Sequence, residues 1–203
     1  MPAKLPPPPV LGESLPQPPA PEVVAFLARR RSSSALALVE PGPTPAELDV
    51  LIRVASRVPD HGKLAPWRFV LLEGTDKAAY AARLEALATE RGDARAATKL
   101  AKLKAPPMAI AVVSRPAPAE IPEWEQLLSA GAVCTTLLYA AQSMGYGANW
   151  ITDWYSYDSD ARAALGLSPD ERVAGFIMLG TAQEAPLERE RPDPAPLISR
   201  WRP

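Results

Sequence analysis

The sequence has little of what metal and disulfide sites need, with one cysteine and one histidine in 203 residues. A single cysteine cannot form a disulfide within the chain, and a zinc site of cysteine and histidine ligands lacks enough ligands. A formal net charge of −1 gives no broad basic field of the kind that binds nucleic acid or anionic lipid. No apolar run approaches the ~20 residues that span a bilayer, and the first 21 residues lack the apolar core of a secretory signal. We therefore expect no metal site, no nucleic-acid or membrane partner, and a cytoplasmic protein.

The composition, 47% apolar and 22% charged, is that of a globular chain. Residues 1–20 are rich in proline, which removes helix donors and leaves few apolar side chains for a core. We expect this segment to be a flexible arm, and docking into a groove or onto a sister subunit is the alternative. Residues 21–203 then form a single domain, in which a second proline-rich segment after Gln183 is expected to wrap over a neighbour.

Hydrophobic periodicity predicts the elements of this domain. Helices are expected over 21–31, after the capping box that begins at Thr44, over 75–91 with Thr75 as the cap, and over 94–104, 123–144 and 158–165. Strands are expected over 67–72, 108–113, 149–152 and 173–179. The helix at 123–144 is the longest and most apolar, and its small residues allow close approach of other helices or of a sister copy.

Several common active-site motifs are absent from the sequence. The turn Gly145-Tyr146-Gly147 follows a helix and lacks the third glycine of a dinucleotide-binding fingerprint. No Walker A stretch is present, and no serine lies in a nucleophile elbow. Cys134 falls within the apolar pattern of the long helix, which is typical of a buried structural thiol. Nucleophilic catalysis is therefore not favoured.

Three features could together hold an anion beside a flat aromatic group. Arg30-Arg31-Ser32 offers two guanidinium groups and a hydroxyl, which suit phosphate, although solvated cations at a helix end are the plain alternative. The loop from Arg57 to Lys63 carries the only histidine, His61, and an ordinary surface loop is its alternative. The segment Trp150-Ile151-Thr152 presents apolar residues and a hydroxyl, although taken alone it is typical of ordinary core.

In this order and spacing, the motifs resemble the flavin-dependent nitroreductase family, specifically its short, single-domain branch. The resemblance extends from about Pro21 to Pro196. It rests on Arg30-Arg31-Ser32, on the string from Pro59 to Phe69, on Trp124-Glu125-Gln126 with Ser129-Ala130-Gly131, on Gly145-Tyr146-Gly147 before Trp150, and on Gly175-Phe176 with Leu179-Gly180-Thr181. It implies an α+β fold with a mostly antiparallel central sheet flanked by helices, non-covalently bound FMN, and an intertwined homodimer with two sites at its interface.

The resemblance also implies roles for individual residues. Arg30, Arg31 and Ser32 would contact the FMN phosphate and ribityl chain or the ring edge. Arg57 and His61 would reach FMN from the other subunit, and Trp150, Ile151 and Thr152 would line the flavin. The nicotinamide donor would lie at the end of the long helix, along Ala140, Ala141, Gln142, Ser143, Met144 and Gly145. No side chain is expected to be catalytic, because the flavin carries out the electron transfer. His61 is expected to donate a hydrogen bond rather than to transfer a proton.

The expected activity is hydride transfer from NADH or NADPH to FMN and then to a nitroaromatic, a quinone or a similar flat acceptor, in a ping-pong mechanism. A non-catalytic FMN-binding or FMN-storage dimer is the alternative, and a structural dimer without cofactor is a third. The sequence departs from the family pattern in two places. The proline-rich arm is an addition, and Ala65 replaces the usual polar residue before Pro66-Trp67.

Overall fold

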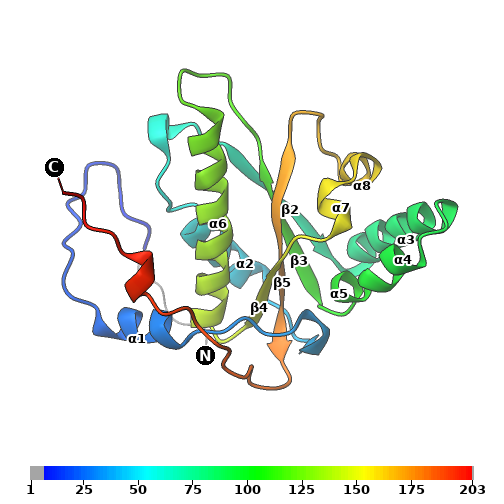
Figure 1. The fold of residues 1–203 in the computed structure, drawn as a ribbon, viewed down its shortest axis with the longest axis horizontal. Coiled ribbons are helices and arrows are strands. Elements are labelled where there is room, and N and C mark those ends of the chain that lie inside the picture. The colour runs from blue at the N-terminus through cyan, green and yellow to red at the C-terminus, as the bar shows by residue number, and fades with distance from the viewer. Residues whose placement is uncertain (1–6, 203) are drawn as a thin grey trace.

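A computed structural model describes residues 7–202 and centres on a five-stranded sheet (Figure 1). The strands are β1 (Leu38–Val39), β2 (Trp67–Glu73), β3 (Met108–Ser114), β4 (Gly147–Ile151) and β5 (Arg172–Ala182). The central strand, β5, pairs with three other strands, β3, β4 and β1. The outer strand β2 pairs with β3, and every pairing is antiparallel. The predicted antiparallel sheet is therefore confirmed.

Helices cover both faces of the sheet and make three layers. They are α1 (Pro21–Arg29), α2 (Pro45–Ala55), α3 (Gly74–Glu90), α4 (Ala94–Lys99), α5 (Ala101–Lys104), α6 (Glu123–Ser143), α7 (Trp154–Tyr157) and α8 (Ser159–Ala164). Short 3-10 turns lie at η1 (Ala35–Ala37), η2 (His61–Lys63) and η3 (Ala195–Leu197). The helices α2 and α6 pack on one face, and α3, α5, α7 and α8 pack on the other. The chain therefore has the predicted α+β architecture.

The alternation of side chains along the buried strands separates two cores. On β3, Ile110 and Val112 point toward α2 and α6, whereas Ala109 and Ala111 point toward α3 and α5. The first of these cores contains most of the inner face of α6, including the fully buried Cys134. The predicted burial of Cys134 is thus confirmed, and burial raises the pKa of its thiol to about 12.

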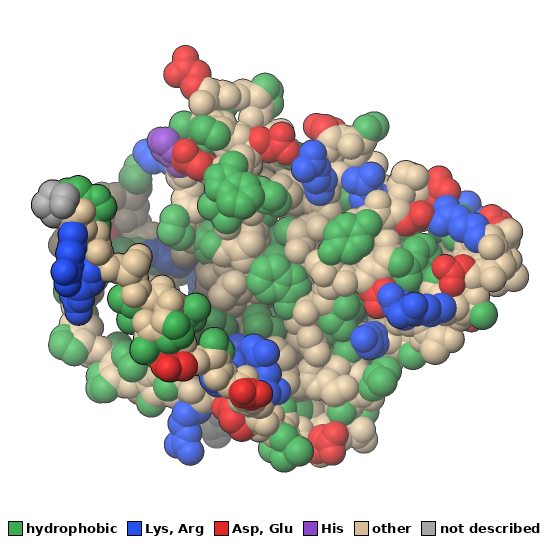
Figure 2. Space-filling view, viewed as in Figure 1, with side chains coloured by type: hydrophobic (Ala, Val, Ile, Leu, Met, Phe, Trp, Pro, Cys, Tyr) green, Lys and Arg blue, Asp and Glu red, His purple; other side chains and the backbone are tan. Residues whose placement is uncertain are grey.

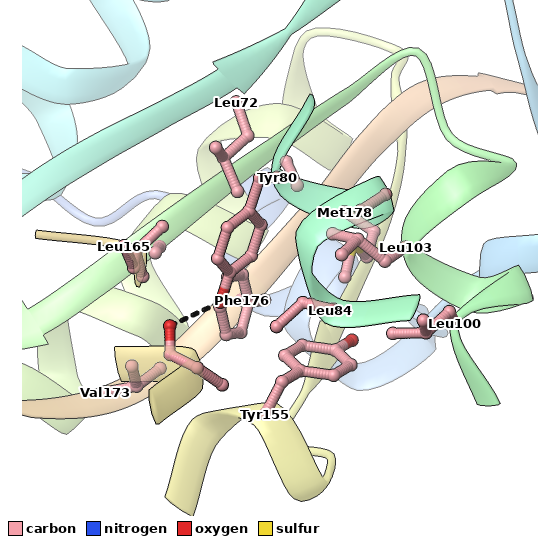
Figure 3. Packing of buried hydrophobic residues seen from close by; sticks show 14 of the residues in the cluster. Leu72, Tyr80, Leu84, Leu100, Leu103, Tyr155, Leu165, Val173, Phe176 and Met178 are labelled. Atoms are coloured by element: carbon pink, nitrogen blue, oxygen red, sulfur yellow. Dashed lines mark hydrogen bonds between the residues drawn. The ribbon is translucent and has the colours of Figure 1, made fainter. Parts of the chain in front are cut away.

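The second core is rich in aromatic rings that pack between β5 and the helices α3 and α7 (Figure 3). The Tyr155 and Phe176 rings meet edge to face with their centroids 5.0 Å apart, and the Tyr80 hydroxyl donates to the Ala161 carbonyl at 3.3 Å. This core packs against one face of β5, and the other face of the same strand lies toward α6.

The predicted elements are present with a few corrections. The third helix begins at Gly74 rather than being capped by Thr75, because Gly74 has a φ of +49° and lets β2 turn directly into the helix. The helix predicted over 94–104 divides at Leu100, whose N–H bonds the Ala97 carbonyl in a tighter, three-residue turn. The strand predicted over 149–152 begins at Gly147, and β5 extends beyond its prediction at both ends. The short elements β1 and α7 were not predicted.

The two terminal segments lie on the same side of α6 (Figure 1). Residues 7–20 of the predicted arm contain no helix or strand, and residues 1–6 of that arm lie outside the described residues. Every residue of α1 is at least partly exposed, and so is the tail over 183–202. Across residues 7–202, we find no helix with both the length and the apolar character needed to cross a membrane.

Candidate functional site

Arg30 lies at the end of α1 and is held in place by α6. Its Nε donates to Gln142 Oε1 at 3.1 Å, and its Nη2 donates to Ser32 Oγ at 3.1 Å. The guanidinium carbon lies 5.6 Å from the centroid of the Tyr139 ring, in cation–π geometry. The Tyr139 ring is itself packed edge to face against Phe26 of α1. Arg30 is thus fixed by three contacts before any ligand binds.

The segment that follows Arg30 runs beside β4. The Ser33 N–H donates to the Ala148 carbonyl at 3.1 Å, and Asn149 Nδ2 donates to the Ser33 carbonyl at 2.5 Å. The Gln142 side chain also donates to the Arg31 carbonyl at 2.6 Å. These bonds place Ser32 between the end of α6 and the end of β4, where Trp150 lies.

A cavity of about 410 Å³ opens where these three elements meet. It is lined by Arg30, Ser32, Thr135, Leu138, Tyr139, Trp150 and Thr152. Its volume is within the range of about 300–1,000 Å³ that is typical of small-molecule sites. The lining combines one guanidinium, several hydroxyl groups and an indole. Such a set can hold an anionic group at one end and a planar group at the other.

Arg30, Ser32, Trp150 and Thr152 were predicted to share one site, and the structure brings their side chains to one cavity. Thr135, Leu138 and Tyr139, which α6 contributes, were not predicted. The signal was available, because Thr135, Tyr139 and Gln142 recur at the spacing of one helix face. The prediction considered only the segment 140–145 of this helix.

Arg31 points away from this cavity. Its Nε donates to the Leu187 carbonyl at 2.9 Å and lies 3.6 Å from Glu188 Oε1, so it binds the C-terminal tail. Arg31 also lines an adjoining cavity of about 700 Å³, between residues 31–34 and the tail. The side chains of the two neighbouring arginines therefore make different contacts.

Ile151 also points away from the cavity. Successive residues of a strand face opposite sides of the sheet, and Ile151 packs against the aromatic core. Only its backbone remains near Trp150 and Thr152.

The other two predicted residues, Arg57 and His61, lie far from Arg30 within the chain. His61 Nδ1 lies 2.7 Å from Glu125 Oε2, in the first turn of α6, whereas Arg30 contacts Gln142 near the end of that helix. At 1.5 Å per residue, the two contacts on α6 are roughly 25 Å apart. Arg57 is exposed beside the His61 loop. One chain alone does not bring these residues to the cavity.

The loop that carries His61 has a fixed backbone. The Asp60 carboxylate accepts hydrogen bonds from the N–H groups of Leu64, at 3.2 Å, and of Ala65, at 2.8 Å. Lys63 and Ala65 have φ values of +55° and +45°, which non-glycine residues adopt only when the surroundings impose them. The conformation of this loop is therefore set by contacts within the chain.

The loop is tied to α6 as well. Ser129 Oγ donates to the Pro59 carbonyl at 2.8 Å and accepts from Trp67 Nε1 at 3.2 Å.

The segment predicted to bind nicotinamide offers few free groups. Ala141 is fully buried, Met144 packs against the core, and Ser143 Oγ donates to the Tyr139 carbonyl at 2.8 Å. Gln142 uses its amide to hold Arg30 and the Arg31 carbonyl. The structure thus gives Gln142 a positioning role, and the donor site stays a prediction.

A further cavity, of about 510 Å³, lies between α3 and residues 104–107. Its buried cation, Lys77, donates to the carbonyls of Leu103, Lys104 and Pro106, and burial lowers its pKa. These contacts use all three ammonium hydrogens, so Lys77 has none left to donate to a ligand. The other charged residues that line this cavity are Glu40, Glu85 and Lys104, and the last two form an ion pair.

The chain was compared with families and proteins of known sequence. The family described as "Nitroreductase family" matches residues 27–181. The chain is similar to a protein of Escherichia coli (strain K12) named "Putative NAD(P)H nitroreductase YdjA". The two are 33% identical over 182 residues, which cover 88% of this chain and 98% of that protein.

Solved structures with a similar fold have lower sequence identity. A nitroreductase-like family protein from Bacillus cereus matches with a TM-score of 0.79 at 19% identity, covering 92% of this chain and 98% of that one. A nitroreductase with bound FMN from Bacteroides fragilis NCTC 9343 matches with a TM-score of 0.67 at 19% identity, covering 89% of this chain and 99% of that one.

Proposed function

Because this chain belongs to the nitroreductase family, we propose that it is an FMN-dependent oxidoreductase that takes hydride from NADH or NADPH. Two relatives support the proposal. The E. coli protein has a name that describes an NAD(P)H nitroreductase, and the B. fragilis structure is described with bound FMN. The observation that carries the proposal is the cavity that joins Arg30 and Ser32 to Trp150 and Thr152.

The residues of this cavity fit FMN. The guanidinium of Arg30 and the hydroxyl of Ser32 supply the charge-assisted and neutral donors that a phosphate requires. The indole of Trp150 supplies a flat apolar wall, and Thr135, Tyr139 and Thr152 supply hydroxyl groups for a polar chain or ring edge. When bound there, FMN would supply the hydride and electron transfer between the nicotinamide donor and a flat acceptor.

The contribution of the protein is to bind and to position. Gln142 and Tyr139 hold the Arg30 guanidinium, so this positive charge is in place before the ligand arrives. Arg31 holds the tail over 187–188 beside the same segment. The cavity residues include no acid–base pair, which agrees with a reaction carried by the cofactor, and we propose ping-pong kinetics at one shared open face.

We also propose that the working unit is a homodimer. The exposed apolar side chains include Trp124 and Leu128 on α6, 67% and 54% exposed, and Val23, Val24 and Leu27 on α1. Figure 2 shows hydrophobic side chains on the outward surface over α6. Exposed apolar patches commonly mark surfaces that another protein covers.

A second copy packed against this surface would cover it. The same packing can bring Arg57 and His61 of one chain to the cavity of the other, which a single chain does not do.

The test is a spectrum followed by a rapid-mixing experiment. The purified protein, after incubation with FMN and removal of the excess, should carry a stoichiometric flavin absorbance. Mixing it anaerobically with NADPH or NADH should bleach that absorbance, and a quinone or a nitroaromatic should restore it.

Two results would count against the proposal. A protein that takes up no FMN contradicts the whole of it. A protein that binds FMN but is not reduced by either nicotinamide favours the alternative of an FMN-binding or FMN-storage dimer.

A further inference from the structure

Gly175 occupies an unusual position in the central strand. The register of β3 against β5 shifts between Val112 and Val113, so that Val112 lies opposite Gly175 and Val113 lies opposite Val173. Gly175 therefore follows directly after the bulged residue, Ala174. A glycine inside a strand weakens the strand, and it commonly marks a place where another group approaches the backbone closely.

The group that approaches Gly175 is the indole of Trp150. In β4, Trp150 lies opposite Ile177, so Gly175 is its diagonal neighbour on the same face of the sheet. The indole Nε1 donates to the Ala174 carbonyl at 3.3 Å. The ring thus lies across β5, and it also lines the cavity.

A side chain at position 175 is incompatible with this placement. A Cβ built on Gly175 would overlap Nε1 of the indole and come within 2.5 Å of Cδ1 and 2.9 Å of Cε2. Ordinary contacts begin at about 3.4 Å, so Cδ1 would have to retreat by about 0.9 Å and Nε1 by more. The φ of Gly175 is outside the left-handed region, so the backbone itself does not require a glycine. The space for the indole remains as the reason for the missing side chain.

We propose that Gly175 is a positioning residue for the proposed FMN site, because its lack of a side chain lets the Trp150 indole pack against the backbone of β5. In this position the indole forms the β4 side of the cavity, which Tyr139 and Arg30 also line. A raised indole would enter the space of the planar group. The choice of FMN as the ligand rests on the proposed function. The geometry rests on the contact between Gly175 and the Trp150 indole.

The test is a double-mutant cycle on Gly175→Ala and Trp150→Ala, with FMN as the probe. FMN affinity is read from the change in flavin fluorescence, and the thermal midpoint of the FMN-free protein is read separately. Gly175→Ala should weaken FMN binding by tenfold or more and lower the midpoint. The double variant should bind FMN no more weakly than Trp150→Ala alone, because the added methyl group then has no indole to displace.

The matched control is Gly42→Ala. A Cβ at Gly42 would meet Pro107 at 3.5 Å, an ordinary contact, and Gly42 does not line the cavity. This variant should bind FMN within about twofold of the parent protein.

The outcomes separate this proposal from the proposed function. Unchanged FMN affinity in Gly175→Ala overturns the positioning role. The role is also overturned if the fold-losses of FMN affinity in the two single variants multiply in the double variant. If the parent protein takes up no FMN, the proposed function fails. The thermal midpoints of the four FMN-free proteins then still show whether Gly175 and Trp150 are coupled. If the midpoint changes of the two single variants add up in the double variant, the proposed contact between the glycine and the indole is overturned.

Discussion

Arg30 and Arg31 are adjacent in the sequence, but their side chains make different contacts. Arg30 is held beside the cavity by Gln142, Ser32 and Tyr139, whereas Arg31 binds the tail. If Arg30 meets the phosphate of FMN, Arg30→Ala removes a charge-assisted contact worth about 1.5–3 kcal/mol, which weakens FMN binding by about one to two decades.

The control for this prediction is Arg29→Ala, since Arg29 does not line the cavity. Flavin fluorescence titration of the three proteins gives the dissociation constants directly. Equal losses in both variants would mean that the net charge of the segment matters and the position of Arg30 does not.

Glu171 gives the molecule a predictable sensitivity to acid. Two hydrogen bonds from Arg68, at 2.6 and 2.7 Å, lower the pKa of this buried carboxyl from 4.5 to about 2. Because the folded pKa lies below the unfolded one, the pair stabilises the fold fully above about pH 4.5. This contribution, about 3 kcal/mol, is lost as the pH falls from 4.5 toward 2.

Glu171→Gln should therefore be less stable than the parent at pH 7, and the difference should shrink through that window. Urea unfolding at a series of pH values measures it, with Glu90→Gln as an exposed control. A difference that stays constant down to pH 2 would show that the ion pair is not its source.

At the residue scale, the sequence identified most of the segments that form the cavity, but it did not show which way each side chain points. Arg30, Ser32, Trp150 and Thr152 were predicted from residue chemistry and family resemblance, and they meet at one cavity. Arg31 and Ile151 were predicted on the same grounds, yet their side chains point elsewhere. Tail contacts and strand register decide those directions, and neither can be read from a short motif.

Among the elements, the loop over 59–66 is the one whose shape depends most on a single side chain. Asp60 accepts from the N–H groups of Leu64 and Ala65, and the backbone at Ala65 is left-handed. Asp60→Ala removes both acceptors and should lower the free energy of unfolding by about 1–3 kcal/mol. Hydrogen exchange at the amides of Leu64 and Ala65 should accelerate as well.

Asp49→Ala, on the exposed side of α2, is the matched control and should leave those amides unchanged. Unaltered exchange in Asp60→Ala would show that the packing of the loop, rather than its carboxylate, sets its conformation.

The long periodic elements were predictable, and the short ones were not. The capping box at Thr44 and the apolar period of α6 fix those helices within a residue or two. The two residues of β1 and the single turn of α7 are too short to show a period. The strand β1 depends on its pairing with β5, and α7 begins at its N-cap, Asp153. The break at Leu100 arises because its fully buried side chain packs into the core at a tightened turn.

At the scale of the whole molecule, the exposed apolar surface of α1 and α6 predicts self-association. The parent protein should sediment as a dimer at micromolar concentration, with an interface above ~2,000 Å². Leu128→Glu would place a charge in that interface and should shift the protein toward the monomer, with loss of FMN. Tyr157→Glu, at an exposed site on α7, should leave the dimer intact. A stable monomer that is loaded with FMN would contradict the prediction.

The separation of His61 and Arg30 along α6 has a consequence for complementation between defective chains. Suppose that one chain carries Arg30→Ala, that the other carries His61→Ala, and that each homodimer binds FMN weakly. If each site takes its arginine from one subunit and its histidine from the other, a mixed dimer contains one intact site and one doubly defective site. If each site lies within one chain, both sites of the mixed dimer keep a single defect. Mixing the two proteins through a dissociated state and titrating with FMN should therefore restore a tight-binding class of sites only in the first arrangement.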